Sequence, residues 1–294
     1  MLDLSSVRDT SEFIVVVTGA GSGLGRAIAL RLLMDGYYCV LAGLEKNDLE
    51  ETLGLAGEYD SRSVVVECDV RSVEDRDRLM GSVAQLPGQL FGLVNNAGVS
   101  RGNPLLDESV QDWRDTMETN LESAFFLSQA AFELMRSHRE GRVVNIGSIY
   151  GVLGLKNRTY GMRAPETTPD DRGPVYQPAY AASKGGLIQL TRSLAAAVGR
   201  WGITVNAISP GAIPWANQEP EMRPSSPRNS TTPKKPGLGD VISRDILAAI
   251  TDEIPLQRLG RVRDVVGPVS FLLSDDAAYI TGVNLLVDGG FTTW

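Results

Sequence analysis

The chain has 294 residues, of which 43% are hydrophobic and 22% charged, a composition typical of a folded globular protein. Its formal net charge of -8 argues against nucleic acid or an anionic membrane surface as the main partner. No basic and then apolar signal stands out at the N-terminus, and no apolar run is long enough to cross a membrane. Cys39 and Cys68 lie in apolar stretches and are expected to be reduced and buried, so we expect a cytoplasmic protein.

Short β-branched runs alternate with longer helical patterns along the chain. The run FIVVVTG (13–19) predicts a buried strand, and the amphipathic pattern at 23–36, closed by a glycine, predicts a helix. Further strands are expected at 37–43, 63–70, 91–98, 141–148, 203–211 and 284–290. Continuous apolar strands separated by helices are typical of a parallel sheet covered on both faces. The pattern therefore predicts an α/β fold with a doubly wound parallel sheet, in a single domain over residues 1–294.

Two stretches interrupt this alternation. Residues 156–178 are polar and rich in proline, glycine and charge, and residues 214–239 contain six prolines and no periodicity. Loops of this length are uncommon in compact domains unless they have a function. For 156–178, a disordered insertion and a flap over a pocket fit equally well. Because 214–239 directly follows a strand, a flap near an active-site mouth is favoured there.

The single histidine, His138, lies in the polar segment MRSHREG at the end of a helical pattern. One histidine cannot supply a histidine-based metal site, and no carboxylates are spaced with it as a ligand set. A surface position near a helix C-terminus is therefore expected for His138. We predict no metal site, and acid–base chemistry must use other side chains.

A glycine-rich turn connects the first predicted strand to the first predicted helix. In VVVTGAGSGLGRAIA, the residues Gly19, Gly23 and Gly25 follow the spacing G-x-x-x-G-x-G. Glycines permit a tight turn and a close backbone approach, and a helix N-terminus offers free N–H groups to a pyrophosphate. A turn required only for packing would look similar, but this position between strand and helix favours a nucleotide.

Several segments together resemble one known family. The short-chain dehydrogenase/reductase family, in its classical type, has motifs that match, in order, the glycine turn, CDV (68–70), NNAG (95–98), ETNLESAF around Asn120, SPG (209–211) and the tail at 258–290. The similarity covers nearly the whole chain and implies a Rossmann-like fold that binds NAD or NADP. It implies cofactor contacts from Gly19, Ser22, Gly23, Leu24, Gly25, Glu45, Asp69, Val70, Asn96, Ala97, Gly98, Tyr180, Lys184, Pro210, Gly211 and Ile213.

The segment from Gly147 to Gly186 contains four tyrosines, of which only Tyr180 has a lysine four residues later. Tyr180 and Lys184 would share one face near the start of a helix, since Pro178 suits a first helical turn. A tyrosine pKa of about 10 is too high for an efficient base at neutral pH. A neighbouring ammonium group and an oxidised nicotinamide ring both favour the phenolate, so we expect a lowered pKa for Tyr180.

The resemblance implies roles for three residues around this tyrosine. Ser148 would hydrogen-bond the reacting oxygen of the substrate, where a hydroxyl stabilises developing charge. Lys184 would also hold the nicotinamide ribose, and Asn120 would hold a water or backbone contact that relays protons to Lys184. The four catalytic candidates are Asn120, Ser148, Tyr180 and Lys184.

Two aromatic residues are candidates for the substrate pocket. Tyr150, two residues after Ser148, either lines the pocket or packs in the core. Trp215 stands where the family often has a threonine that helps to hold the cofactor, and it either covers the nicotinamide or lines the pocket. Tyr160 and Tyr176 have no chemical partner in the sequence and are expected on a loop surface.

The end of the second strand should distinguish NAD from NADP, because an acidic residue there bonds the ribose hydroxyls and a basic one accepts a 2′-phosphate. Gly43 and Leu44 occupy the positions of the usual aspartate and arginine, and Ser22 lacks the basic character found in many NADP-dependent relatives. Glu45 could reach the ribose, and Lys46 could reach a phosphate. The residues slightly favour NAD.

The sequence therefore predicts an NAD(P)-dependent oxidoreductase that interconverts a secondary alcohol and a carbonyl, with a small-molecule substrate that is sugar- or polyol-like. A 3-oxoacyl-thioester reductase, a non-catalytic cofactor-binding sensor, and an isomerase or dehydratase with a tightly held cofactor are the alternatives. The apolar C-terminal segment fits the homotetramers or homodimers common in the family, although core packing explains most of it equally well.

Overall fold

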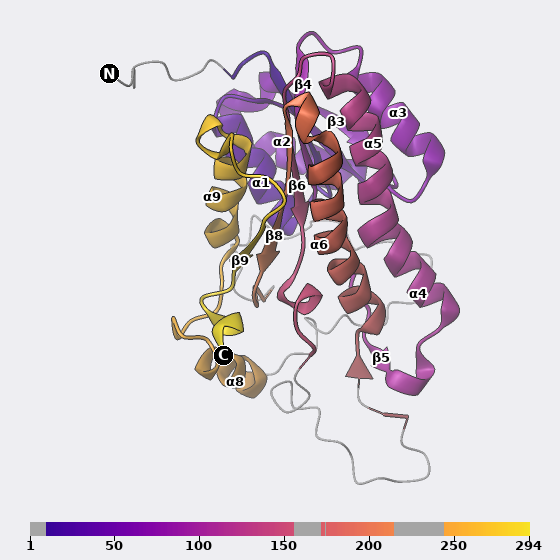
Figure 1. Cartoon of the computed structure of the whole chain (residues 1–294), viewed down its shortest axis with the longest axis vertical. Helices are drawn as coiled ribbons and strands as arrows, with labels where there is room; N and C mark the ends of the chain where they lie inside the picture. Colours follow the sequence, from indigo (N-terminus) through magenta and orange to yellow (C-terminus); the bar gives the residue numbers. More distant parts are fainter. Residues whose placement is uncertain (1–9, 156–171, 174, 215–243) are drawn as a thin grey trace.

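The computed structural model describes residues 10–155, 172–173, 175–214 and 244–294. Their centre is a parallel sheet, which every predicted strand joins, with ends up to three residues shorter than expected (Figure 1). In their order across the sheet, the seven strands are β3 (Ser63–Glu67), β2 (Tyr38–Gly43), β1 (Phe13–Thr18), β4 (Gln89–Asn95), β6 (Gly141–Ile146), β8 (Ile203–Pro210) and β9 (Asn284–Val287). All six neighbouring pairs are parallel, which confirms the predicted fold class.

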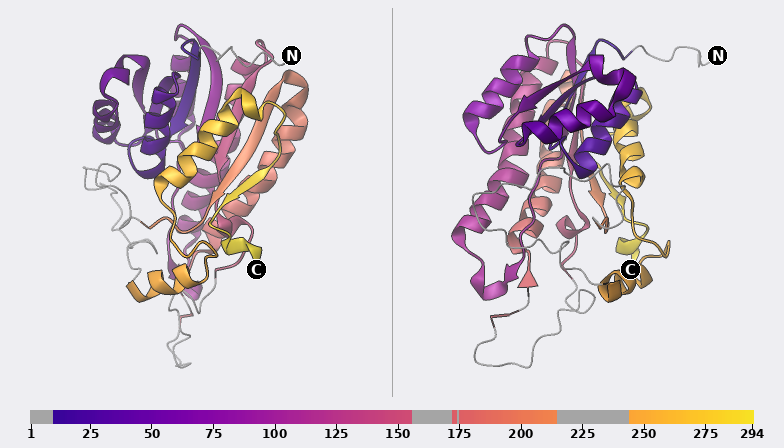
Figure 2. Two further views of the ribbon diagram at one scale, coloured as in Figure 1. Left: turned by 90° about the vertical axis from the view of Figure 1, so that its left-hand side faces the viewer. Right: turned by 180° about the vertical axis from the view of Figure 1, so that it is seen from behind.

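Helices cover the sheet on both faces because its central strands are apolar on both sides. One layer consists of α1 (Gly23–Met34), α2 (Lys46–Leu55) and α9 (Val262–Leu273), which bury residues in one core cluster. The other consists of α3 (Val73–Val83), α5 (Ser123–Met135) and α6 (Pro178–Val198), with α4 (Val110–Met117) packed against α6. Figure 2 shows the two layers on opposite sides of the sheet.

The strand order reverses at the centre of the sheet, between β1 and β4. The connections after these two strands leave toward opposite faces, and in sheets of this kind a ligand-binding crevice is expected beyond the carboxyl ends at this point. The glycine turn follows β1 at Gly19, and the NNAG motif occupies the end of β4. The sheet therefore brings the two motifs to one place, although 76 residues separate Thr18 from the Val94 carbonyl with which it bonds.

Short elements complete the described part of the chain. They are η1 (Gly57–Arg62), β5 (Asn103–Pro104), η2 (Leu105–Asp107), η3 (Glu118–Glu122), η4 (Ile149–Gly151), β7 (Val175–Tyr176), η5 (Gly199–Trp201), α8 (Arg244–Asp252), η8 (Asp275–Ala277) and η9 (Phe291–Thr293). Strands β5 and β7 form a separate antiparallel pair. Helix α8 lies beyond the carboxyl ends of β6 and β8 (Figure 1), where its Ile250 packs with Ile149 and Phe291.

The predicted loop at 156–178 ends earlier than expected, because β7 lies within it and α6 begins at Pro178. Tyr176 is part of β7, is partly buried, and donates a hydrogen bond from its hydroxyl to the Leu155 carbonyl at 3.2 Å. The expectation of a loop-surface position for Tyr176 was therefore wrong, since pairing with β5 fixes it. Tyr160 and nearly all of 214–239 lie outside the described residues.

Several expectations from composition are confirmed. Cys39 and Cys68 are buried and form no disulfide. His138 is exposed in the turn after α5. Within the described part of the chain, every helix is too short or too polar to be a membrane-spanning segment.

Candidate active site

The glycine turn forms the floor of the crevice. Gly19 and Gly23 have φ angles of +66° and +56°, which residues with a Cβ rarely adopt. Ser22 occupies the N-cap position of α1 with no side-chain capping bond, so no side chain of the cap covers the first N–H groups of the helix. Leu24 lies in this first turn and packs on the core. A helix N-terminus of this kind fits the pyrophosphate of a dinucleotide.

Gly25 has a different function from the other two glycines. A Cβ on Gly25 would collide with the Gly19 carbonyl oxygen and would lie 2.5 Å from the side-chain nitrogen of Asn96. Helix α1 therefore approaches the turn closely only because position 25 has no side chain. Gly25 therefore permits the close packing of α1 against the turn.

Asn96 and Thr18 tie the NNAG segment to the turn. The Asn96 Nδ2 donates to the Thr18 carbonyl at 2.8 Å, and the backbone N–H groups of Asn96 and Ala97 both donate to the Thr18 hydroxyl at 3.0 Å. The Asn96 side chain thus supports the turn from behind. Thr18 was missed in the sequence because its partners lie almost 80 residues away.

Gly98 lies where this segment meets the catalytic residues. A Cβ at this position would lie 3.3 Å from Asn120 Oδ1 and 3.6 Å from Lys184 Nζ. The absence of a side chain on Gly98 lets this segment pack closely against both groups, which are buried.

The side of the crevice where the sequence predicts adenosine lies beyond the ends of β2 and β3. Asp69 accepts two hydrogen bonds from the guanidinium of Arg71, from Nε at 3.0 Å and from the terminal nitrogen at 2.6 Å. Burial alone would raise the pKa of Asp69, but the hydrogen bonds from Arg71 hold it below its usual value. Val70, beside it, is buried. The Asp69 carboxylate is therefore ionised and fixed in orientation near neutral pH.

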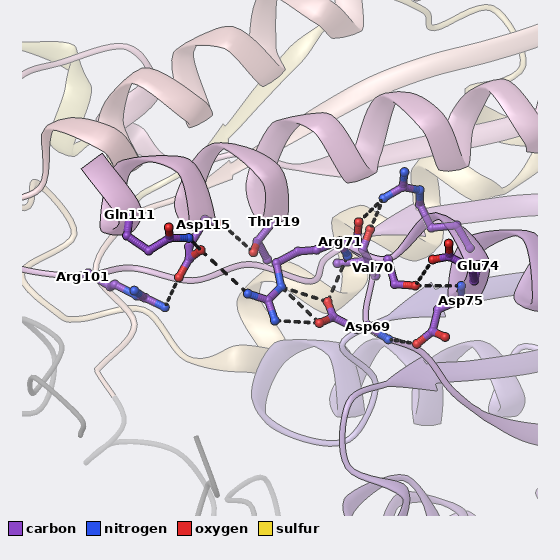
Figure 3. A network of polar contacts seen from close by, with 11 residues as sticks. Asp69, Val70, Arg71, Glu74, Asp75, Arg101, Gln111, Asp115 and Thr119 are labelled. Carbon is purple, nitrogen blue, oxygen red and sulfur yellow. Dashed lines mark hydrogen bonds and ion pairs between the residues drawn. The ribbon is translucent and has the colours of Figure 1, made fainter. Parts of the chain in front are cut away.

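A chain of polar contacts runs from Asp69 to α4 (Figure 3). Arg71 lies 4.0 Å from Asp115, and Asp115 in turn forms an ion pair with Arg101 at 3.1 Å. The backbone N–H of Asp69 donates to Asp75 at 2.8 Å. These contacts hold the loop after β3 against α3 and α4, and no single motif in the sequence predicted them.

The residues after β2, where the cofactor ribose is expected, include the two candidates Glu45 and Lys46. Glu45 is the N-cap residue of α2, is partly exposed, and makes no side-chain capping bond. Lys46 forms an ion pair with Glu50 at 3.5 Å. Leu44 is exposed, and a Cβ on Gly43 would lie 3.3 Å from the Leu49 side chain.

Tyr180 and Lys184 lie one turn apart on α6, as their spacing predicted. Pro178 begins this helix, and the Lys184 Nζ lies 5.7 Å from the centroid of the Tyr180 ring. Ser148 follows β6, is buried, and lies near enough to the Tyr180 side chain to lower its pKa in part. The Ser148 oxygen also accepts the Tyr150 N–H at 3.2 Å. The fold thus brings Ser148, Tyr180 and Lys184 together.

The pKa values of this pair differ from the expectation. Burial raises the pKa of Tyr180 above 10, and the hydrogen bond from Ser148 offsets only part of that effect. Burial also lowers the pKa of Lys184 to about 8. The predicted lowering of the Tyr180 pKa is therefore wrong for the protein by itself, because desolvation of the phenolate is the largest cause of the shift and raises the pKa.

Asn120 lies in a π-helical turn. Helices α4 and α5 are joined by η3, in which the Ser123 N–H donates to the Glu118 carbonyl five residues earlier. The Asn120 amide bonds Val99 twice, accepting its N–H at 2.8 Å and donating to its carbonyl at 2.9 Å, and it donates to the Ser183 hydroxyl at 3.0 Å. The side chain of Asn120 thus bonds the NNAG segment and α6, while the Lys184 Nζ donates to the Ile146 carbonyl at 2.6 Å.

The far side of the crevice is formed by the end of β8. The Gly211 N–H donates to the Val287 carbonyl at 3.0 Å, which holds the segment after Pro210 against β9. Ile213 is partly buried against the core. Tyr150 packs beside Ile149 and α8, and Trp215 lies outside the described residues.

Two further observations concern a neighbouring hollow and metal binding. A hollow of about 570 Å³ is lined by the cofactor candidate Gly211 together with Leu256, Arg258 and Asp288, and no catalytic candidate lines it. Among the described residues, no three His, Cys, Asp or Glu side chains are grouped to hold a metal ion.

Comparisons with known proteins agree with this geometry. Residues 13–160 match the family model for short chain dehydrogenases, and residues 169–223 and 226–292 match the model described as enoyl-(acyl carrier protein) reductase. The 3-oxoacyl-[acyl-carrier-protein] reductase FabG of Escherichia coli is 35% identical over 280 residues, which cover 94% of this chain and 96% of that protein. The 2-(S)-hydroxypropyl-CoM dehydrogenase 3 of Xanthobacter autotrophicus is 30% identical over 279 residues, or 95% and 96% of the two chains.

Solved structures resemble the fold over the same length. A protein of Sinorhizobium meliloti described as a short-chain alcohol dehydrogenase has a TM-score of 0.78 and 32% identity, covering 97% of this chain and 98% of its own. A protein of Agrobacterium tumefaciens described as a gluconate dehydrogenase has a TM-score of 0.77 and 26% identity, covering 96% and 97%. The chain therefore belongs to the short-chain dehydrogenase/reductase family, and it is an NAD(P)-dependent oxidoreductase that acts on CH–OH groups.

Proposed function

We propose that this protein interconverts a secondary alcohol and a carbonyl compound with Tyr180 as the group that transfers the proton. The observation that carries the proposal is the position of buried Ser148 beside the Tyr180 side chain, with Lys184 one helical turn away and its Nζ 5.7 Å from the Tyr180 ring centroid. A substrate oxygen between these two side chains would accept a hydrogen bond from the Ser148 hydroxyl. It would exchange a proton with the Tyr180 hydroxyl. The reacting carbon would then face the crevice above the glycine turn.

The three side chains have distinct tasks in this proposal. During alcohol oxidation, Tyr180 accepts the proton of the substrate hydroxyl, and during carbonyl reduction it returns that proton. The Ser148 hydroxyl donates to the substrate oxygen as charge develops on it. Lys184, with a pKa of about 8, is still mostly protonated at pH 7 and favours the phenolate form of Tyr180 electrostatically. Asn120 keeps the NNAG segment at the correct distance from α6.

A nicotinamide cofactor supplies the hydride acceptor or donor when bound. We propose that the backbone at Gly19, Gly23 and Gly25 holds its pyrophosphate, and that Asp69 and Val70 hold its adenine. The remaining proposed contacts are Ser22, Leu24, Glu45, Asn96, Ala97, Gly98, Tyr180, Lys184, Pro210, Gly211 and Ile213.

We also propose a preference for NAD over NADP. Glu45 makes no capping bond with α2 and can accept from ribose hydroxyls, whereas Lys46 is already paired with Glu50. A 2′-phosphate beside the Glu45 carboxylate would meet a charge of its own sign.

Two substrate classes are supported by different observations. A sugar- or polyol-like substrate is supported by the polar composition of 156–178 and by the similarity to a structure described as a gluconate dehydrogenase. A 3-oxoacyl thioester is the second candidate, supported by 35% identity to a reductase of that name. Tyr150 and Trp215 are the proposed pocket residues, and they would contact either substrate.

The experiment compares the wild type with Tyr180→Phe on polyols, sugar acids and secondary alcohols with NAD⁺ or NADP⁺, and on acetoacetyl-CoA with NADH or NADPH. Absorbance of the reduced nicotinamide reports turnover. We expect turnover to fall by about 10³-fold in Tyr180→Phe, with cofactor affinity unchanged. Equal turnover in the two proteins would remove Tyr180 from the mechanism, and the active substrate would choose between the two classes.

We further propose that the protein forms homodimers or homotetramers and functions in the cytoplasm. Strand β9 is the last strand of the sheet, and its Leu285 and Leu286 are 36% and 40% exposed, as is the C-terminal Trp294 at 72%. Apolar edges of this kind are covered by other chains in stable proteins. Light scattering on a gel-filtration column tests the subunit number, and a monomer would overturn the proposal. Both buried cysteines are free thiols, which supports the proposed cytoplasmic location.

A further inference from the structure

Arg26 is a fully buried cation on α1, one residue after the last glycine of the turn. Its guanidinium donates to the Gly21 carbonyl twice, from Nε at 3.1 Å and from the terminal nitrogen at 2.6 Å. Gly21 lies in the middle of the glycine turn. Arg26 therefore holds the turn from the side that faces away from the crevice.

The same guanidinium also binds α2. It donates to Glu51 Oε2 at 2.7 Å, to the Asp48 carbonyl at 3.4 Å, and from Nε to the Thr52 hydroxyl at 3.0 Å. The hydrogen bonds of Arg26 reach the turn, 5 residues away, and α2, 22 to 26 residues away. It thus connects two segments that no strand pairing joins directly.

Thr52 makes a second connection between the same segments. Its hydroxyl oxygen lies 3.0 Å from both the Ala20 carbonyl and the Asp48 carbonyl, and it accepts from Arg26. The turn and α2 are in close contact here, since a Cβ on Gly21 would lie 2.9 Å from the Asp48 Cβ. Arg26 and Thr52 together are called the turn brace below.

The position of the turn brace relates it to the cofactor site. The glycine turn is proposed to hold the pyrophosphate, and Glu45, at the start of α2, is proposed to hold the adenosine ribose. Any change in the separation of these segments would misplace one half of the adenosine diphosphate relative to the other. Packing alone does not require a cation there, because an apolar side chain fills a core position at a lower desolvation cost than a buried ion pair.

We propose that the turn brace is a positioning device that sets the affinity of the protein for the adenosine half of the cofactor. The proposal rests on the function proposed above, and it assigns Arg26 and Thr52 an effect on binding without contact with the cofactor. Loss of the brace would weaken binding by relaxing a preorganised site, and it would leave the Ser148–Tyr180 geometry in place.

The test uses isothermal titration of ADP-ribose against the wild type, Thr52→Val, Arg26→Lys and Thr116→Val. Thr116 is the matched control, because it is equally buried and its hydroxyl bonds the carbonyl four residues earlier at 2.7 Å, as Thr52 does, but it lies on α4. Thr52→Val tests the brace in a protein that keeps the buried ion pair. Arg26→Lys keeps the charge and loses the planar geometry of the guanidinium.

We expect the Kd of ADP-ribose to rise about fivefold in Thr52→Val and more than about tenfold in Arg26→Lys, since each variant loses one or more buried hydrogen bonds. The KM for the cofactor should rise in parallel, whereas kcat at saturating cofactor should change by less than about twofold. Thr116→Val should lower the melting temperature and leave the Kd unchanged.

Two results would contradict the proposal in different ways. If Thr52→Val binds ADP-ribose as the wild type does while its melting temperature falls, the brace is purely structural, whether or not Arg26→Lys folds. If the wild type itself does not bind ADP-ribose or NAD(P), the proposed function fails first, and the brace loses the site on which it acts.

Discussion

The two ends of the crevice are built from different interactions. At the adenosine end, charged groups occur in pairs, such as Asp69 with Arg71 and Arg26 with Glu51. At the catalytic end, the cation of Lys184 has no carboxylate partner among the described residues, and its Nζ donates to a backbone carbonyl. Carboxylates and guanidinium groups as a class do not change charge near neutrality, whereas burial brings the pKa of Lys184 to about 8 at the second end.

This difference suggests that cofactor binding and proton transfer depend on different groups at the two ends. A site that must hold a constant ligand benefits from ion pairs that fix its geometry over a wide pH range. A site that must transfer a proton needs groups whose protonation can change, and an unpaired buried amine beside a tyrosine meets that need. Substitutions at the two ends should therefore affect different kinetic constants.

The largest effect is expected for Ser148→Ala. Removal of the hydroxyl that stabilises the reacting oxygen should lower kcat by about 10²- to 10³-fold, while the Kd of the cofactor stays the same. Steady-state kinetics and titration of the cofactor measure the two quantities. The control is Ser137→Ala, since Ser137 is exposed in the turn after α5 and should have no effect. A large change in cofactor affinity in Ser148→Ala would show that the two ends are not separate.

Gly25→Ala should affect the Kd of the cofactor rather than kcat. Because the new methyl group collides with the Gly19 carbonyl, the turn must move, and the Kd of the cofactor should rise at least about tenfold. Gly81→Ala in α3 is the control, because an added Cβ there meets nothing within 4 Å. That helix-interior change should raise the free energy of unfolding by about 0.5–1 kcal/mol. Unaltered cofactor binding in Gly25→Ala would contradict the tight approach of α1 to the turn.

Lys184→Met tests the role of burial at the catalytic end. The pKa of Lys184 falls from 10.5 to about 8 on folding, so between these values the unfolded chain binds more protons than the folded one. The penalty for burying the amine is therefore fully present below pH 8 and is relieved as the pH rises toward 10.5. The stability advantage of Lys184→Met over the wild type should shrink by on the order of 2 kcal/mol between pH 7 and pH 9.5.

Urea unfolding at the two pH values measures this change. Lys46→Met serves as the control, because the Lys46 side chain is 61% exposed and removing it relieves no burial of an amine. A difference between Lys184→Met and wild type that is the same at both pH values would mean that the amine is hydrated in solution.

The smallest effect is expected for Arg71→Gln. Asp69 would keep its backbone contacts but lose its guanidinium partner, so its pKa should rise toward the usual value. The contact is partly exposed, so the Kd of the cofactor should rise only about two- to fivefold. Arg136→Gln removes a similar surface pair with Glu133, remote from the crevice, and should leave the Kd unchanged. A loss as large as that in Gly25→Ala would mean that the network in Figure 3 is required for the turn itself.

Local patterns in the sequence predicted the fold and the catalytic pair. Apolar runs gave every strand of the parallel sheet, since burial on both faces requires apolar residues at successive positions. Tyr180 and Lys184 were found because residues four apart share one face of a helix. The glycine turn was recognised from its position between strand and helix.

Contacts between distant segments could not be predicted in the same way. The partners of Thr18, Arg26 and Asn120 lie up to 79 residues away, and no periodicity relates them. The raised pKa of Tyr180 also escaped prediction, because the sequence shows which charges are near but not how much water is excluded. Trp215 and Tyr160 lie outside the described residues, so their positions stay predictions.

The π-helical turn at η3 means that the path from α4 to α5 contains one residue more than a regular helix needs. Each helical residue advances the chain by about 100° around the axis. Deletion of one residue of Glu118–Glu122 other than Asn120 would therefore restore a regular helix and rotate α4 relative to α5 by about that angle. Asn120 would no longer face Val99 and Ser183 together, even though the asparagine itself was kept. At this point of the chain, length is as strictly constrained as residue identity, and a deletion would be more harmful than most substitutions.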